Sequence, residues 1–136
     1  MSRQIIAWLI TVAIGVTVSL VSGASYLEIL LPGGLPIGNA LAAIGLCSAA
    51  GAAVGLSQSG TSLRRISTAS LVAAMAWLPI SVALAGNLAL NFKEANGFAW
   101  LGLSLATVLA VLGSFAWAVV RLLLKGRPNA GSSDAS

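Results

Sequence analysis

Histidine is absent from this chain of 136 residues, and other residues that carry chemistry are scarce. There are one cysteine, three acidic residues and seven basic residues. Without histidine the chain has no imidazole to bind haem or zinc or to act in His-based acid–base catalysis. Cys47 alone builds neither a metal cluster nor an intrachain disulfide. We therefore expect no cofactor, no metal site and no enzymatic activity.

Charge is also scarce, and this predicts the class of the protein. Only 7% of the residues are charged and 58% are hydrophobic, whereas a soluble domain carries about 25% charged residues. The mean hydropathy is +0.99. A soluble fold of this composition could not cover its core with polar surface, so we predict an integral membrane protein in contact with lipid. The net charge of +4 comes from scattered residues at segment ends, which indicates topology and not nucleic-acid binding.

Four uncharged runs are present, at residues 4–27, 29–63, 66–92 and 95–120. Each exceeds the roughly 20 residues that cross a bilayer as a helix, and a helix satisfies its own backbone groups in lipid. A cluster of proline and glycine over 32–36 divides the second run into a loop and a helix. We predict an all-α bundle of four transmembrane helices, at about 4–22, 37–57, 66–90 and 97–124. They form one membrane domain over 1–125, and the polar tail over 126–136 is predicted to be disordered.

The distribution of basic residues predicts the orientation. With the N-terminus inside, one side holds six of the seven basic residues, namely Arg3, Arg64, Arg65, Arg121, Lys125 and Arg127. Lys93 lies on the other side with Glu28 and Glu94. We therefore expect both termini in the cytoplasm and the plasma (inner) membrane as the location. One alternative is that Arg3, the first apolar run and Ser22-Gly23-Ala24 form a cleavable signal, which would leave three helices.

Small residues recur every four positions in three of the spans and predict close helix packing. The packing residues expected from this spacing are Gly15 and Ser19 in the first span, Gly51 and Gly55 in the second, and Gly102, Ala106, Ala110 and Ser114 in the fourth. The spacing suits packing within one bundle, and it also suits dimerisation. Pro79 lies in the middle of the third span and predicts a kink there.

Tryptophans near span ends act as interfacial anchors in membrane proteins. Trp8, Trp100 and Trp117 have such positions, whereas Trp77 falls at mid-membrane depth, where core packing is expected.

Polar residues gather toward the predicted outer side and are the candidate site. Asn39 and Asn87 fall at similar depth in the second and third spans, where two amides facing the bundle would bond each other. The candidate outer polar cluster comprises Glu28, Asn39, Asn87, Asn91, Lys93 and Glu94. The alternative is that these are ordinary polar residues at loop ends.

Two functions fit this pattern. The first is a non-enzymatic membrane protein that works by association, as an accessory or assembly subunit of a membrane complex or as a self-associating bundle. The alternative is an oligomeric pore, facilitator or small-solute transporter lined by Thr11, Ser19, Asn39, Ser81, Asn87, Ser104, Thr107 and Ser114. Small multidrug-resistance exporters of this length rely on a glutamate in the first span, and residues 4–27 contain none.

Overall fold

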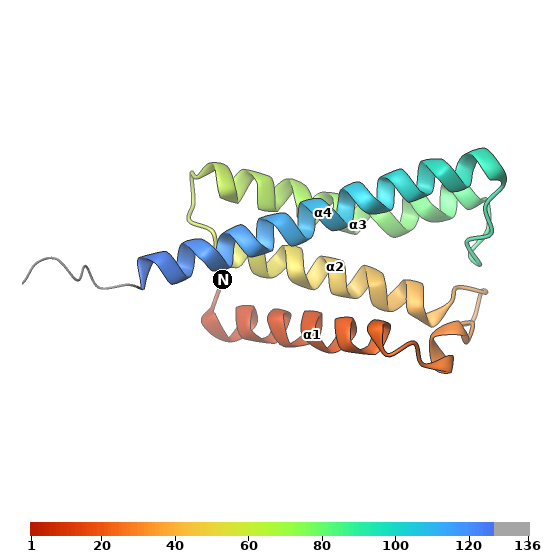
Figure 1. Ribbon diagram of the computed structural model, residues 1–136, viewed down its shortest axis with the longest axis horizontal. Helices are drawn as coiled ribbons and strands as arrows, with labels where there is room; N and C mark the ends of the chain where they lie inside the picture. Colours follow the sequence, from red (N-terminus) through yellow and green to blue (C-terminus); the bar gives the residue numbers. More distant parts are fainter. Residues whose placement is uncertain (127–136) are drawn as a thin grey trace, which may run out of the picture.

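A computed structural model describes residues 1–126 of the chain and shows an all-helical protein (Figure 1). Its elements in chain order are α1 (Arg3–Val21), the 3-10 turn η1 (Ser25–Glu28), α2 (Ile37–Leu56), α3 (Ser62–Ala85) and α4 (Glu94–Lys125). These four α-helices are long and apolar enough to cross a membrane, which confirms the prediction at that level. The predicted disordered tail lies outside the described residues, apart from Gly126.

The helix ends follow from local capping residues. Thr61 Oγ1 accepts a hydrogen bond from the Arg64 backbone N–H at 3.2 Å and so starts α3 earlier than the predicted residue 66. Gly86 adopts the left-handed conformation (φ 70°) and ends the same helix after Ala85, because glycine takes this conformation without steric cost. Residues 87–90, expected inside the third span, therefore belong to the loop that precedes α4.

α2 is the central helix, and the other three pack around it unequally. α2, α3 and α4 all contact one another, whereas the substantial contact of α1 with another of the described helices is with α2 alone. Figure 1 shows α1 and α2 side by side, with α3 and α4 on the far side of α2. Within the predicted set of four helices, the structure is thus a three-helix core with an appended helix.

Glycines on α2 receive the large side chains of α1. A β-carbon placed at Gly45 would lie 2.8 Å from Val16 Cγ1, and one at Gly51 would lie 3.3 Å from Leu9 Cδ1. At Gly55 the nearest side-chain atom is from Ile6, at 2.8 Å. The two helices approach closely because glycine leaves room for these side chains. Gly51 and Gly55 thus lie in a helix interface, as predicted.

α3 and α4 meet each other and α2 along a seam of buried residues spaced alternately by three and four. The seam comprises Leu63, Ser67, Ser70, Ala74, Trp77 and Ser81 from α3, with Thr107, Val111, Ser114 and Ala118 from α4. Ser70 Oγ donates across the seam to the Ala110 carbonyl at 3.2 Å. Since most of these side chains are small, the two backbones pack closely without a bulky core between them.

Most of the predicted small-residue ridge on α4 lies outside this seam. Gly102, Ala106 and Ala110 are exposed, and of that ridge only Ser114 is buried. On α1, Gly15 is exposed, with no atom within 4 Å of where a β-carbon would lie, and Ser19 is half-buried. Packing of the α4 ridge within the described bundle is thus limited to Ser114, because a step of four residues turns about 40° around a helix of 3.6 residues per turn. A ridge at fixed spacing of four therefore winds out of an interface that alternates threes and fours. Dimerisation through the exposed residues stays a prediction.

Pro79 does not interrupt α3, which continues from Ser62 to Ala85 around it. Proline has no N–H to donate to the Met75 carbonyl, so the helix lacks one backbone hydrogen bond at this point. The neighbours Trp77 and Ser81 are both buried in the seam, and their packing holds the helix across the missing bond.

Candidate functional site

Within the described residues, hydrogen bonds join only Asn87 and Asn91 of the outer polar cluster. Asn87 lies just beyond α3, and its side-chain amide donates to the carbonyls of Ala85 (3.0 Å) and Asn91 (3.1 Å). Its Oδ1 accepts from the Asn91 backbone N–H at 3.0 Å. Both amide hydrogens of Asn87 are therefore used within its own loop, and the predicted bond to Asn39 is wrong. The physical reason is that Gly86 ends the helix before Asn87, so this amide is not carried into the bundle.

The remaining members of the cluster lie at the same end of the molecule but in separate positions. Asn39 is half-buried in the first turn of α2, whereas Glu28 ends η1 and is exposed. Lys93 is the N-cap residue of α4 and Glu94 its first residue, both exposed. Glu28, Lys93 and Glu94 thus lie at element ends, and a function for the cluster stays a prediction.

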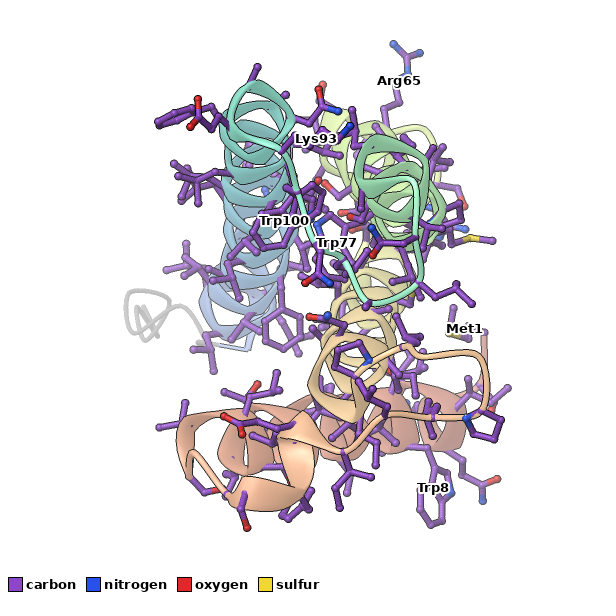
Figure 2. All side chains as sticks on the ribbon, turned by 90° about the vertical axis from the view of Figure 1, so that its right-hand side faces the viewer. Met1, Trp8, Arg65, Trp77, Lys93 and Trp100 are labelled. Carbon is purple, nitrogen blue, oxygen red and sulfur yellow. The ribbon has the colours of Figure 1, made fainter. Side chains whose placement is uncertain are left out.

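A network of indole and hydroxyl groups joins α3 to α4 and was not predicted. Trp77 Nε1 donates to Ser104 Oγ at 2.9 Å, and Trp100 Nε1 donates to Ser81 Oγ at 3.0 Å. Ser81 Oγ in turn donates to the Trp77 carbonyl at 2.6 Å. Figure 2 shows the two tryptophans between these helices. The sequence signal is a repeated spacing of four residues, from Trp77 to Ser81 and from Trp100 to Ser104. Each serine accepts the hydrogen bond of the tryptophan on the other helix.

Trp100 is therefore not the lipid-facing anchor that its position near a span end suggested. It is half-buried, stacks on Phe92 with ring centroids 4.9 Å apart, and lies 6.5 Å from the Trp77 ring. By contrast, Trp8 is 71% exposed and Trp117 is 44% exposed. Figure 2 shows Trp8 pointing away from the bundle.

An apolar groove opens between α1 and α4, with α2 as its floor. Two adjoining cavities of about 230 and 270 Å³ share Ala13 and Thr17 of α1, Ala49 of α2 and Leu112 of α4. The hydroxyl of Thr17 donates to the Ala13 carbonyl at 2.8 Å, so its polar hydrogen is already bonded within α1. The groove lies near the middle of the helices and exists because α1 packs on α2 without closing against α4.

Comparison with protein-family models, curated proteins and solved structures finds no match. The geometry of the chain is thus the basis for an inference about its function.

The buried polar side chains of the described residues are hydroxyl groups. Within residues 1–126 no three His, Cys, Asp or Glu side chains gather to hold a metal ion. The buried polar side chains of the same region are all serine or threonine, namely Ser48, Ser57, Ser67, Ser70, Ser81, Thr107 and Ser114. Every buried side-chain oxygen or nitrogen in this part of the chain has a hydrogen-bond partner. Most of these hydroxyls bond within their own helix or, as Ser67 and Ser70 do, to a residue of another element.

Proposed function

We propose that this chain is an integral membrane protein that works by association, and that the groove between α1 and α4 receives a transmembrane helix of a partner or of a second copy. The observation that carries the proposal is the unequal packing of α1, whose substantial contact among the described helices is with α2 alone. One side of α1 and one side of α4 are thereby left facing each other across an open space.

The lining of the groove suits a helix. The groove carries the small residues Ala13 on α1 and Ala49 on its α2 floor, which let another backbone come close. Its rims carry large apolar side chains, with Ile14 59% exposed and Leu112 55% exposed. At mid-membrane depth water does not fill such a space, so lipid chains or apolar side chains occupy it. Packing of side chains into a shaped groove is the main attraction between helices in lipid.

The hydroxyl groups expected to line a pore favour association instead. Ser81 and Ser104 accept the two indole N–H bonds in the α3–α4 seam. Thr107 and Ser114 donate to the carbonyls of Leu103 and Val111 within α4. Thr11 lies on exposed α1 and donates to Ala7. These groups belong to different elements, and the hydroxyls of Thr11, Ser81, Thr107 and Ser114 already donate to backbone carbonyls.

We further propose that both termini lie in the cytoplasm and that the chain spans the plasma (inner) membrane with α1 retained. The support is the separation of charge along the molecule, because the ends of α1, α3 and α4 that carry Arg3, Arg65 and Lys125 lie together (Figure 1). Basic residues are retained on the cytoplasmic side during insertion. Retention of α1 is supported by its contacts with the glycine face of α2, which cleavage would leave bare.

The test is site-specific photo-crosslinking in intact membranes. A photoreactive amino acid replaces Leu112 at the groove, and in the control it replaces Val72, which is 61% exposed on α3. We expect one discrete protein adduct from position 112 and none from position 72. Copies with two different tags show whether the adduct is a second copy or another polypeptide. Absence of any protein adduct at position 112 would contradict the proposal.

A further inference from the structure

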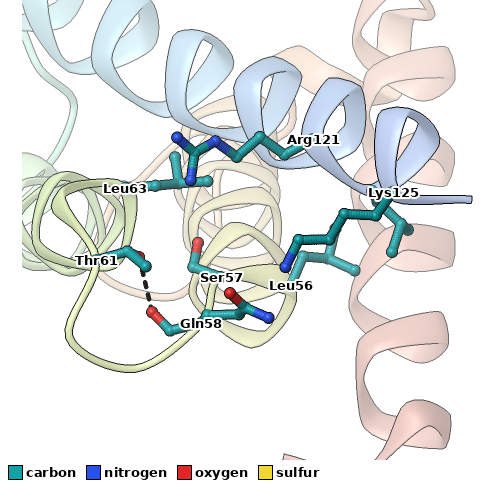
Figure 3. Close-up of a pocket in the computed structure, with 8 residues that line it drawn as sticks. Leu56, Ser57, Gln58, Thr61, Leu63, Arg121 and Lys125 are labelled. Atoms are coloured by element: carbon teal, nitrogen blue, oxygen red, sulfur yellow. Dashed lines mark hydrogen bonds between the residues drawn. The ribbon is translucent and has the colours of Figure 1, made fainter.

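Another cavity, of about 140 Å³, lies at the end of the molecule where α2, α3 and α4 meet. We refer to it as the basic-end pocket, and it is lined by Leu56, Ser57, Gln58, Thr61, Leu63, Arg121, Leu122 and Lys125. Figure 3 shows the Arg121 and Lys125 side chains reaching from α4 over the end of α2. The two residues are four apart, so they lie one turn apart on the same face of the helix.

The positive charge of this pocket has no carboxylate beside it in the described part of the chain. The acidic residues within 1–126 are Glu28 and Glu94, and both lie at the opposite end of the helices. The third acidic residue of the sequence, Asp134, lies outside the described range. Arg121 instead lies over the ring of Trp117, 5.8 Å from its centroid, a contact that leaves the guanidinium N–H groups able to donate.

A neighbouring arginine has a structural role and is not part of the site. Arg64 Nη1 donates to the carbonyls of Val54 and Ser57, at 3.1 and 3.2 Å, and so caps the C-terminus of α2. Thr61 Oγ1 is also engaged, since it donates to the Gln58 carbonyl at 2.7 Å. The groups left to bind a ligand are the Arg121 guanidinium, the Lys125 ammonium and the side-chain amide of Gln58 (Figure 3).

The depth of the pocket indicates which anion it meets. Leu122, Leu123 and Leu124 directly follow Arg121 and are 53%, 66% and 61% exposed, so α4 still presents apolar side chains at this level. Trp117, one turn before Arg121, is 44% exposed, as expected for a residue at the membrane interface. Cations at the end of such a helix lie where the phosphates of the lipid headgroups lie.

We propose that the basic-end pocket binds the phosphate of an anionic phospholipid headgroup, held by Arg121 and Lys125 with Gln58 as a neutral donor. Arginine suits this role because its planar guanidinium donates two parallel hydrogen bonds to a phosphate. The leucines at positions 56, 63 and 122 form the apolar part of the pocket wall, beside the lipid's glycerol region. The inference rests on membrane insertion but not on a partner helix in the groove.

The experiment measures lipid retained by the purified full-length protein in mild detergent, by native mass spectrometry at fixed ionic strength. Phosphatidylglycerol and phosphatidylcholine with identical acyl chains are the two probes. Wild-type protein is expected to retain phosphatidylglycerol preferentially. The R121Q/K125Q variant is expected to lose this preference, by about fivefold for each cation removed and about 25-fold for the pair. The charge-preserving R121K/K125R variant is expected to keep most of it.

The matched control is R65Q, which removes an exposed cation from the same end of the molecule without touching the pocket. Figure 2 shows Arg65 pointing away from the helices. Equal retention of both lipids by wild-type protein, or an equal loss in R65Q and R121Q/K125Q, would overturn the proposal. Displacement of bound lipid by millimolar inorganic phosphate would also overturn it, because the site would then recognise a free anion. The Leu112 crosslink is expected to be unchanged in R121Q/K125Q, which separates this inference from the proposed association.

Discussion

Glycines at positions 15 and 45 both lie inside apolar helices, yet their surroundings differ completely. At Gly15 on α1 an added β-carbon meets nothing within 4 Å, whereas at Gly45 on α2 it meets Val16 Cγ1 at 2.8 Å and Cβ at 3.4 Å. Valine is branched at Cβ and has one strongly preferred rotamer in a helix, so it cannot turn away. The cost of an extra methyl group therefore depends on the neighbouring helix and not on the glycine itself.

We expect Gly45→Ala to destabilise the protein, although alanine is the better helix former. The gain in helix propensity is about 1 kcal/mol and overpacking costs typically 1–3 kcal/mol, so the net loss should be on the order of 1 kcal/mol. The measurement is the free energy of unfolding in a denaturing-detergent titration. Gly15→Ala is the control and should leave stability unchanged or raise it by up to about 1 kcal/mol. Equal effects of the two substitutions would show that α1 does not pack on α2 through Val16.

At the scale of single helices, the connection between α2 and α3 is stabilised by Arg64. Its guanidinium donates to the carbonyls of Val54 and Ser57 at the C-terminus of α2, where the last carbonyls of a helix lack the usual partners four residues on. The positive charge also interacts favourably with the negative end of the helix dipole. The next residue, Arg65, is exposed. Two adjacent arginines that look equivalent in the sequence thus have different roles.

Arg64→Gln is expected to lower the free energy of unfolding by about 2 kcal/mol, since hydrogen bonds to a charged group are worth roughly 1.5–3 kcal/mol. Arg65→Gln should change it by less than about 0.5 kcal/mol, as is usual for exposed positions. Both values come from the same unfolding titration in one detergent. If Arg65→Gln proves the more costly of the two, the capping role assigned to Arg64 is wrong.

The pairing of α3 with α4 shows how far local sequence predicts an element's neighbours. Apolar run length correctly indicated both helices, but of the small residues at spacing four on α4 only Ser114 lies in the seam, beside Thr107 and Val111. The contact between α3 and α4 is marked instead by a tryptophan and a serine four residues apart on each helix. Which hydroxyl meets which indole depends on the register of two antiparallel helices, and no local pattern in either helix contains that register.

At the scale of the whole molecule, charge is divided between the two ends of the helices. Arg3, Arg64, Arg65, Arg121 and Lys125 lie at the end that holds the start of α1, the α2–α3 loop and the end of α4. Lys93 lies at the other end with Glu28 and Glu94. This polarity is the basis for placing both termini in the cytoplasm.

Reporter fusions test that orientation. Alkaline phosphatase is active only outside the cytoplasm, so a fusion after Lys125 should be inactive and one after Asn91, in the α3–α4 loop, should be active. A cytoplasmic reporter such as green fluorescent protein should give the opposite pattern at the same two positions. Phosphatase activity after Lys125 would reverse the proposed topology.

The sequence alone determined that the described chain is helical and has four segments able to cross a membrane. This was possible because the free energy of transferring a side chain into lipid is a property of each residue type. The sum of these free energies over about 20 consecutive residues identifies a span. The positions of the charged residues between the spans also predicted which ends of the helices carry most of the basic residues and which carry Glu28 and Glu94. The candidate polar cluster was less predictable. Because α3 ends at Gly86, the Asn87 side chain bonds within its own loop, whereas one more turn of helix would have placed it in the bundle.

Tertiary structure decided which faces meet and which stay open. Val16 against Gly45, and Trp77 with Ser104, are contacts between residues distant in the chain. So is the convergence of Arg121 and Lys125 on the end of α2. These contacts, and the groove that α1 leaves beside α4, depend on steric fit between helices. Hydropathy cannot encode such fit, because every face of these helices is apolar enough for lipid.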